Sequence, residues 1–361
     1  MWFFIIGFMI LSCAVGLFYL ITRFRRFYMI KALTGKRSWL FAALPVVFLI
    51  GVAIFAPIAM VVVILHLILV WALCDLVGYV VQKLRKQSFK RYYQGAFAIL
   101  LTAVYLAMGW YNAHHIVQTN YTFQTEKLLG RDSLRIVLIA DSHLGEVLTS
   151  EKFVEELKNI QAAQPDLVVI CGDYVDDDTT KADILLATKA LGELESTYGT
   201  YYVFGNHDKG YMRSRDFTAD ELRSTLTENG ITILQDDALL IDDSFYLIGR
   251  QDRSEHSRAS IAELTADLDP SKYTVVLNHQ PNDYDNEAAS GVDLVLSGHT
   301  HGGHIFPVGE IGLLIGANDK IYGAEQREKT NFVVTSGISG WGVPFKTFAI
   351  SEYVVIDIVQ E

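Results

Sequence analysis

Five short polar clusters in this 361-residue sequence carry side chains of the kinds that bind divalent metal ions. Each cluster follows a short apolar run that is typical of a buried β-strand. Because the active sites of open α/β sheets collect at the carboxyl ends of strands, we expect all five to meet at one edge. In chain order they are Asp141-Ser142-His143, Gly172-Asp173-Tyr174-Val175-Asp176, Gly205-Asn206-His207-Asp208, Asn278-His279 and Gly298-His299-Thr300-His301-Gly302-Gly303-His304.

The candidate ligands combine nitrogen and oxygen donors and include no thiolate. That mixture suits Zn, Mn or Fe rather than a Cys-rich structural zinc site. These candidate ligands are more than one ion needs, and they suffice for two divalent ions that share one bridging carboxylate. The candidates are Asp141, His143, Asp173, Asn206, His279, His299 and His301.

A pair of metal ions predicts phosphoryl-transfer chemistry. Two ions roughly 3.5–4 Å apart lower the pKa of a shared water and hold the attacking and leaving oxygens of a phosphoryl group. We expect the bridging hydroxide to attack phosphorus in line, which leaves the protein mainly with positioning and charge neutralisation. An imidazole that titrates near neutral pH suits a general acid, and His207 is the candidate.

The elements that must position these residues alternate between strand and helix. Apolar runs predict strands at 134–140, 166–171, 200–204, 273–279 and 292–299, and a strand-rich tail at 331–359. Amphipathic stretches predict helices beginning near Thr149, near Lys181 and over 216–230, with Thr149 or Ser150 able to cap the first. The pattern is that of an α/β domain with additional β-structure.

The front of the chain has a different composition. Residues 1–112 contain eleven Lys and Arg and one acid, Asp75, whereas the remainder contains 19 basic and 40 acidic residues. A basic, apolar front joined to an acidic back indicates a membrane part and a water-soluble part. We expect no nucleic-acid partner, because a general nucleic-acid binder needs a basic face.

Apolar runs of the front predict four membrane-spanning helices. They cover about 1–22, 39–56, 59–81 and 93–112, which gives a membrane region at 1–115 and a second domain at 116–361. Basic loops at 23–37 and 83–91 favour the cytoplasmic side. We therefore expect a multi-pass cell-membrane protein whose second domain is extracytoplasmic.

The five clusters, read as DxH, GDxxD, GNHD, a lone His and GHxH in that order, resemble the calcineurin-like metallophosphoesterases over about residues 130–361. The GHTHGG form and the four-helix front are most similar to a membrane-associated bacterial branch that includes enzymes acting on lipid-linked substrates. The resemblance implies a four-layer αββα sandwich of two mixed sheets with helices outside.

The resemblance also implies roles for the candidate residues. Asp141, His143 and His301 would bind one ion, and Asn206, His279 and His299 the other. Asp173 would bridge both ions. His207 would face the substrate phosphate and protonate the leaving oxygen, and Asp208 would orient its ring.

Several residues remain outside this assignment. His304 stands where the resembling branch often has Gln, and Lys346 where relatives tend to carry Arg, which weakens any expectation of a bidentate phosphate contact. Asp176 suits a residue that orients a ligand histidine. His66 and Asp75 lie in the third span, nine residues apart, and so on opposite faces of one helix.

The function expected from these observations is a membrane-anchored hydrolase of phosphate monoesters, diesters or pyrophosphates. Its substrate would be a phosphorylated small molecule or lipid, and a membrane anchor favours a lipid-linked or envelope compound. The alternatives are a non-catalytic scaffold with the same fold and a membrane sensor, in which the four helices do the main work.

Overall fold

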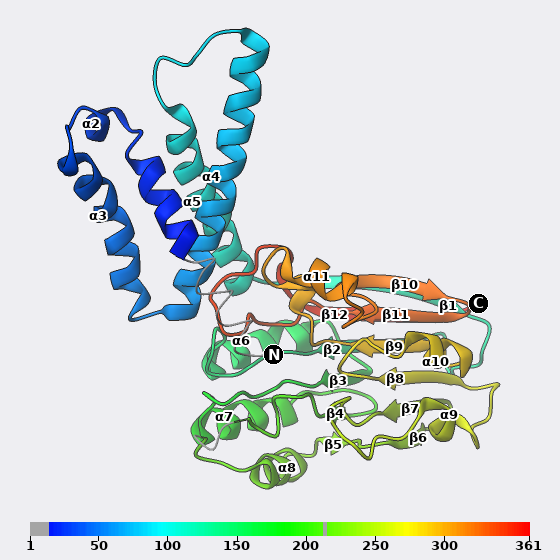
Figure 1. Cartoon of the computed structure of the whole chain (residues 1–361). Helices are drawn as coiled ribbons and strands as arrows, with labels where there is room; N and C mark the ends of the chain where they lie inside the picture. The colour runs from blue at the N-terminus through cyan, green and yellow to red at the C-terminus, as the bar shows by residue number, and fades with distance from the viewer. Residues whose placement is uncertain (1–13, 212–214) are drawn as a thin grey trace. The chain divides into compact units, whose positions relative to one another are not determined.

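A computed structural model describes residues 14–211 and 215–361. The chain divides into two compact units, Met1–Met108 and Gly109–Glu361, so the division falls inside the last predicted span rather than after it. Figure 1 shows both units, the first built from helices and the second from two sheets with flanking helices. Below, these are called the helical unit and the sheet unit.

The helical unit contains the predicted apolar helices, except for the last turn of α5, which belongs to the sheet unit. Helices α3 (Lys36–Ala53), α4 (Pro57–Arg85) and α5 (Tyr93–His114) are each long and apolar enough to cross a membrane. A short helix α2 (Tyr28–Lys31) precedes them, and the chain turns at Ala56 with Pro57 in the first turn of α4, where a missing N–H costs nothing. Of the four predicted spans, three are therefore found among the described residues. The remaining span is the first one, predicted at about 1–22. Its described part is the apolar helix Ala14–Phe24, and residues 1–13 lie outside the described part of the chain.

Asp75 is packed inside the helical unit. Its carboxylate pairs with Arg23 at 2.9 Å and accepts hydrogen bonds from the hydroxyls of Tyr92 at 2.6 Å and Tyr19 at 3.2 Å. His66 has a different partner, because its Nδ1 donates to the carbonyl of Val62, 2.8 Å away. The two residues do not form a pair, as their spacing on one helix predicted.

The helices of the sheet unit begin where the sequence places capping residues. Thr149, Thr180 and Thr218 accept backbone hydrogen bonds at the starts of three helices, and the last two form capping boxes. These are α6 (Ser150–Ala162), α7 (Lys181–Gly192) and α8 (Ala219–Glu228). Shorter helices follow at α9 (Ile261–Thr265), α10 (Tyr284–Ala289), η1 (His301–Gly303) and α11 (Val308–Leu314).

Twelve strands of the described chain form two six-stranded mixed sheets. The first has the order β1-β12-β2-β3-β4-β5, with strands at Ile116–Thr125, Ser351–Gln360, Ser133–Ile139, Leu167–Cys171, Thr200–Val203 and Thr232–Ile233. The second has the order β10-β11-β9-β8-β7-β6, at Gly323–Arg327, Thr330–Val334, Leu294–Ser297, Tyr273–Leu277, Phe245–Gly249 and Asp237–Ile241. Strands β2, β3 and β4 are parallel neighbours, as are β7, β8 and β9.

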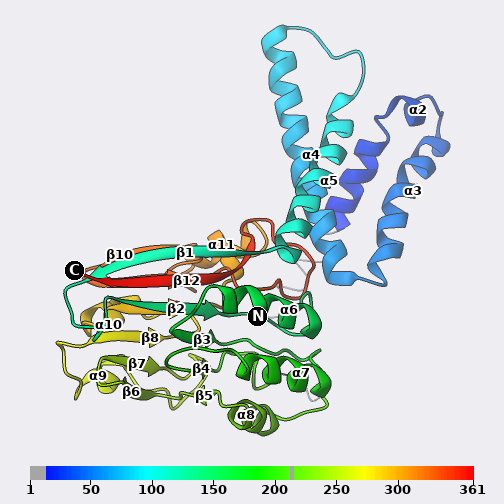
Figure 2. The same ribbon diagram turned by 180° about the vertical axis from the view of Figure 1, so that it is seen from behind.

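Three apolar clusters establish the order of layers. One cluster, with Leu138, Val169 and Leu296, lies between the two sheets. A second packs the first sheet against α6, α7 and α8, and a third packs the second sheet against α9 and α10. The predicted four-layer αββα sandwich is confirmed (Figures 1 and 2).

One long strand was not predicted. Strand β1 begins two residues after α5 ends and pairs in parallel with β12 along all ten of its residues. In its sequence, IVQTNYTFQT, Tyr121 and Phe123 pack against the core between the sheets and Ile116 packs against the core on the other face. Such a weak period-2 signal marks a half-exposed edge strand rather than a buried one.

Candidate metal centre

The predicted polar clusters come together at the carboxyl ends of strands from both sheets. Asp141, Asp173 and Asn206 follow β2, β3 and β4 of the first sheet, and His279 and His299 follow β8 and β9 of the second. Because these strands run parallel to their neighbours, their polar ends gather at the same edge of the sandwich. The sheet order therefore brings together residues separated by up to 160 positions.

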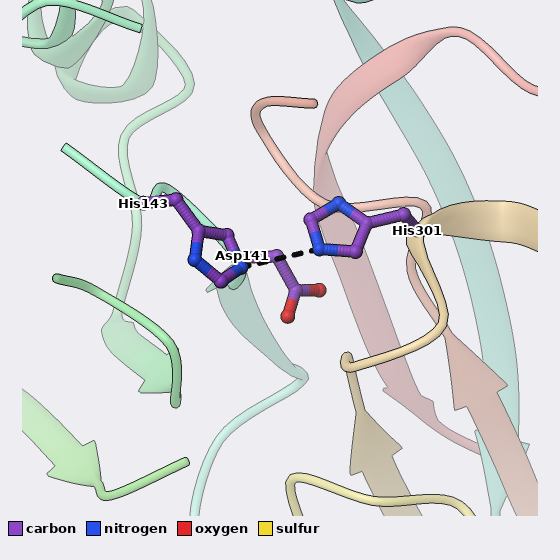
Figure 3. Close-up of side chains that lie close together, drawn as sticks. All are labelled: Asp141, His143 and His301. Atoms are coloured by element: carbon purple, nitrogen blue, oxygen red, sulfur yellow. Dashed lines mark hydrogen bonds between the residues drawn. The ribbon is translucent and has the colours of Figure 1, made fainter. Parts of the chain in front are cut away.

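A first group of potential ligands consists of Asp141, His143 and His301, whose donor atoms all lie within 4.8 Å of one another. Figure 3 shows the two imidazoles facing each other with the Asp141 carboxylate beside them. The Nδ1 of His143 donates to Asp176 at 2.7 Å, and the Nδ1 of His301 donates to the carbonyl of Ser339 at 3.1 Å. Each ring is thereby held with its Nε2 toward its neighbour.

This arrangement fits a metal ion. With both Nδ1 atoms protonated, the two Nε2 atoms present lone pairs to each other across 3.2 Å. Two facing lone pairs repel unless a proton or a cation lies between them. An ion bound at about 2.0–2.1 Å to two nitrogens in a tetrahedron separates them by roughly 3.3 Å, close to the distance found.

A second group consists of Asp173, His279 and His299. The Nδ1 of His279 donates to the carbonyl of Cys171 at 2.7 Å, so its Nε2 faces two acceptors, Asp173 Oδ2 at 3.1 Å and Asn206 Oδ1 at 3.2 Å. The amide nitrogen of Asn206 donates to the hydroxyl of Tyr211, which fixes its oxygen toward the site. The convergence of these acceptors on an imidazole lone pair also calls for a proton or a cation.

Asp173 lies between the two groups. Its Oδ2 is 3.1 Å from Nε2 of His279 in the second group and 3.7 Å from Nε2 of His143 in the first. Its other oxygen accepts the backbone N–H of His207 at 2.8 Å. A carboxylate oxygen that lies within 3.7 Å of a histidine nitrogen from each ligand group has the position expected of a bridging ligand.

The protonation states of the site also suit metal ligands. Burial lowers the pKa of His299 to about 4 and that of His301 well below its usual range, so both rings are neutral at neutral pH and offer lone pairs. Burial raises the pKa of Asp141 to about 6, although nearby His279 opposes this. Burial alone would lower the pKa of His279, but the charge and hydrogen bond of Asp173 raise it well above its usual range. A divalent ion would replace that buried proton.

His207 lies beside the first group and belongs to neither of the two groups above. With His143 and Asp176 it forms a third group whose donor atoms lie within 4.8 Å of one another. Its Nδ1 is 3.2 Å from Asp176 Oδ1, so one carboxylate holds both His143 and His207. Its ring packs edge-on against Trp341 at 5.1 Å and Tyr211 at 4.9 Å between ring centres. Sequence reasoning missed both aromatic residues, since Trp341 lies 134 positions away and neither belongs to a ligand pattern.

The expected role of Asp208 is wrong. Its fully buried carboxylate accepts backbone N–H groups of Asp173, Tyr174, Val175 and Gly205 at 2.6–3.2 Å. Asp208 therefore ties the loop after β3 to the loop after β4, and Asp176 contacts the His207 ring instead. A side chain next to His207 in sequence points away from its ring because the loop uses it to satisfy buried N–H groups.

Backbone strain is concentrated at the centre. Asp141, His143, Asp173, His299 and His301 all have positive φ, between 37° and 70°. Non-glycine residues rarely adopt this conformation, and it persists only where the surrounding contacts enforce it. Five of the seven predicted ligands thus depend on their loops for position.

Gly205 shows how little space these loops leave. A Cβ on this residue would lie 2.2 Å from Asp173 Oδ1 and 2.8 Å from His279 Nε2. We expect Gly205→Ala to displace both ligands and to weaken Mn²⁺ binding by at least about tenfold, which calorimetry measures. Gly312→Ala is the matched control, because its Cβ meets nothing nearer than 3.9 Å. Equal Mn²⁺ affinity in Gly205→Ala and Gly312→Ala would show that the loops can shift to accommodate the added methyl group.

Lys346 and His304 lie behind the ligands rather than among them. Lys346 is completely buried, and its Nζ donates to the carbonyl of Ser336 at 2.5 Å and more weakly to those of Gly337 and Ser339. This places Lys346 behind the carbonyl that orients His301, away from a phosphate contact. The ring centre of His304 lies 5.2 Å from that of His301, and burial lowers its pKa to about 3.

Comparison with known proteins shows that this chain is similar to metallophosphoesterases. Residues 134–303 match the family described as calcineurin-like phosphoesterase. The chain is 36% identical over 235 residues to an uncharacterized metallophosphoesterase of Campylobacter jejuni, which covers 63% of this chain and 60% of that protein. It is 33% identical over 249 residues to an uncharacterized metallophosphoesterase of Aquifex aeolicus, covering 66% and 90%. A transmembrane protein with metallophosphoesterase domain of Bos taurus is 30% identical over 268 residues, covering 70% and 59%.

The chain belongs to the calcineurin-like phosphoesterase family. Membership supports a hydrolase acting on phosphoester bonds, and the His and Asp groups indicate divalent metal ions. The apolar helices and the transmembrane relative indicate a membrane protein. The match spans about three fifths of the Campylobacter jejuni and Bos taurus relatives.

Proposed function

We propose that this protein is a membrane-anchored phosphoesterase with two divalent ions, whose substrate is a lipid-linked phosphate ester or pyrophosphate. The observation that carries the proposal is the placement of Asp173 between two groups of metal ligands, with His207 beside them. Bound ions would supply a water of lowered pKa and neutralise the charge of the phosphoryl group. By the charge of its basic loops, the sheet unit lies outside the cytoplasm.

The residues of this chain have distinct tasks in that reaction. His207 carries a proton toward the leaving oxygen, and Asp176 holds its ring through Nδ1. Trp341 and Tyr211 contact two sides of the His207 ring and limit its movement. The same Asp176 also holds His143, so the acid and one metal ligand share a single anchor.

An exposed apolar surface next to the centre supports a lipid substrate. It consists of Phe306, Val308, Ile311, Leu314, Ile315, Trp341 and Phe348, and Leu314 and Ile315 are 86% and 72% exposed. Helix α11 packs closely on η1, which begins with His301, because a Cβ on Gly309 would lie 2.5 Å from the Cα of Gly303. Large apolar side chains exposed along one short helix and in the loops of the same unit favour contact with another apolar phase.

The same surface is linked to the end of the last apolar helix. The backbone N–H of Lys346 donates to the carbonyl of Gly109 at 2.8 Å, and the Asn112 side chain donates to the carbonyl of Lys346 at 3.1 Å. Because α5 is long enough to span a bilayer, its last turn marks where the chain leaves the membrane. Within the sheet unit, the loop that carries Lys346 therefore lies beside the last turn of α5.

A substitution on this surface tests the lipid assignment. For the full chain with both Leu314→Ser and Ile315→Ser, we expect the ratio of kcat/KM on a lipid phosphodiester to that on a soluble diester to fall about tenfold, since two exposed apolar side chains are lost from lipid contact. Exchange of the exposed but distant Leu185 and Leu186 for Ser is the control. An unchanged ratio in the α11 variant would remove lipid contact from the proposal.

The pH profile tests the role of Asp176. Burial lowers the pKa of His207, but the hydrogen bond to Asp176 and the charges of Asp173 and Asp176 raise it by more, so the ring stays protonated to higher pH than usual. An acid is active below its pKa, so kcat should fall on the alkaline side. In Asp176→Asn we expect this limb to move about one pH unit lower at saturating Mn²⁺.

Exposed Asp220, on α8, provides the comparison for that profile. Asp220→Asn removes the same charge far from His207 and should leave the alkaline limb in place. Equal profiles for wild type and Asp176→Asn would show that Asp176 does not set the titration of the acid.

A substrate screen of the full chain with Mn²⁺ tests the proposal as a whole. We expect turnover of a lipid phosphodiester or pyrophosphate in mixed micelles to exceed that of soluble mono- and diesters. Faster turnover of soluble monoesters would overturn the lipid assignment. Stoichiometric metal without turnover of any ester would favour a non-catalytic scaffold.

A further inference from the structure

A cavity of about 620 Å³ lies in the helical unit, far along the chain from every predicted metal ligand. Two stretches of chain line it, within residues 22–38 and within residues 82–94. They contain the connection from the first apolar helix to α3 and the connection from α4 to α5. Figures 1 and 2 show both connections at the same end of the helical unit.

The cavity is strongly cationic. Five basic side chains line it, namely Arg25, Arg26, Lys31, Lys90 and Arg91, and the described lining includes no Asp or Glu. The sequence has a single acid in residues 1–112, Asp75, and its carboxylate is already engaged by Arg23, Tyr92 and Tyr19. The described side chains of the helical unit therefore offer these five charges no carboxylate partner. Like charges around one concavity repel unless an anion joins them.

Two of the arginines are held by groups that leave their charge uncompensated. Arg25 donates from Nε to the hydroxyl of Ser38 at 3.0 Å, and its guanidinium lies 4.4 Å from the ring centre of Trp39. The guanidinium of Arg26 lies 5.5 Å from the ring centre of Tyr92, whose hydroxyl is fixed by Trp71 and Asp75. Ring faces position a guanidinium while its N–H edge stays available for an oxyanion.

We infer that this cavity binds the phosphate group of an anionic lipid headgroup. Its volume falls within the range of small-molecule sites, and a planar guanidinium matches the oxygens of a phosphate. Its lining connects the ends of helices that are long enough to span a membrane, which is the depth at which headgroups lie. Basic pockets at that depth, on the side with the excess of Lys and Arg, suit anionic lipids.

The alternative is that these basic residues only contribute to the excess of positive charge in the loops, without forming a binding site. In that case, any three basic residues at this end of the helical unit would be equivalent. The chain offers this comparison, because Lys83, Arg85 and Lys86 lie next to the cavity in sequence but do not line it. A binding site requires the lining residues in particular.

The test is lipid binding by the purified full chain in detergent, measured by native mass spectrometry. The probes are dioleoylphosphatidylglycerol, dioleoylphosphatidylcholine and inorganic diphosphate. Wild type should bind one phosphatidylglycerol in preference to phosphatidylcholine. In Arg26→Gln/Lys90→Gln/Arg91→Gln the affinity for phosphatidylglycerol should fall on the order of 100-fold. In Lys83→Gln/Arg85→Gln/Lys86→Gln it should stay within about threefold of wild type.

Each other outcome overturns the inference. Equal losses in the two triple variants would mean that net charge, and no site, attracts the lipid. Tight diphosphate binding without any preference for phosphatidylglycerol would assign the cavity to a soluble phosphate compound. Monodisperse elution and unchanged helical circular dichroism of both variants ensure that a loss reports on binding rather than on folding.

Discussion

Replacing His207 with Ala should lower kcat by about 10²–10⁴-fold while leaving metal content at the wild-type level, because a general acid contributes that much to proton transfer. The ring belongs to neither group of predicted ligands, although its donor atoms lie with those of His143 and Asp176 in a third group that could hold an ion. The backbone N–H of His207, which alanine keeps, donates to Asp173. Turnover of the full chain and metal analysis of the same preparation measure the two quantities.

The leaving group provides an internal control for this prediction. A p-nitrophenolate departs without protonation, whereas an alkoxide needs a proton as the bond breaks. His207→Ala should therefore lose much more activity on an alkyl phosphodiester than on a p-nitrophenyl diester. Equal losses on both would remove the acid role, and loss of metal would make His207 a ligand instead.

The fold was predictable where local pattern determines structure. Apolar runs located β2, β3, β4, β8 and β9, and Thr caps located the helices between them. The candidate ligands followed because each stands directly after one of these strands. Parallel pairing then brings them to one edge without any further information.

What could not be predicted depends on how side chains turn within loops. Asp208 stands next to His207 in sequence, whereas Asp176 stands 31 positions before it. Yet of these two residues only Asp176 contacts imidazoles, while Asp208 accepts four backbone N–H groups. Trp341 reaches His207 from a loop that no periodic pattern describes. The structural role of Lys346 depends on three carbonyl groups to which its Nζ donates, and no local pattern predicts these contacts.

Strain explains why local pattern fails at the centre itself. Left-handed backbone at Asp141, Asp173 and His301 is opposed by local preference and maintained by long-range contacts. The loop carrying Ser339 is one such contact, because its carbonyl orients His301 from 38 positions away. Residues whose geometry is determined by distant neighbours lie beyond any reading of local sequence.

Replacing Asp173 with Ala should abolish the binding of both metal ions, which is the largest single effect on metal content expected anywhere in the chain. One of its oxygens lies 3.1 Å from His279 and 3.7 Å from His143, so the two ligand groups meet at this atom. Without the carboxylate, His143 and His279 would have to hold a cation with less negative charge nearby. Metal analysis of the full chain purified with Mn²⁺ measures the loss.

Thermal unfolding gives a second measure of the same property. Ligand at about 100 times its Kd stabilises a protein by roughly 2.7 kcal/mol, so Mn²⁺ should raise the Tm of the wild-type chain by about 5–10 °C. The Tm of Asp173→Ala should not respond to Mn²⁺. Asp220→Ala removes an exposed acid and should respond as the wild type does. If Asp173→Ala kept one ion, the carboxylate would belong to one ligand group only, and if it kept both, the bridge would not exist.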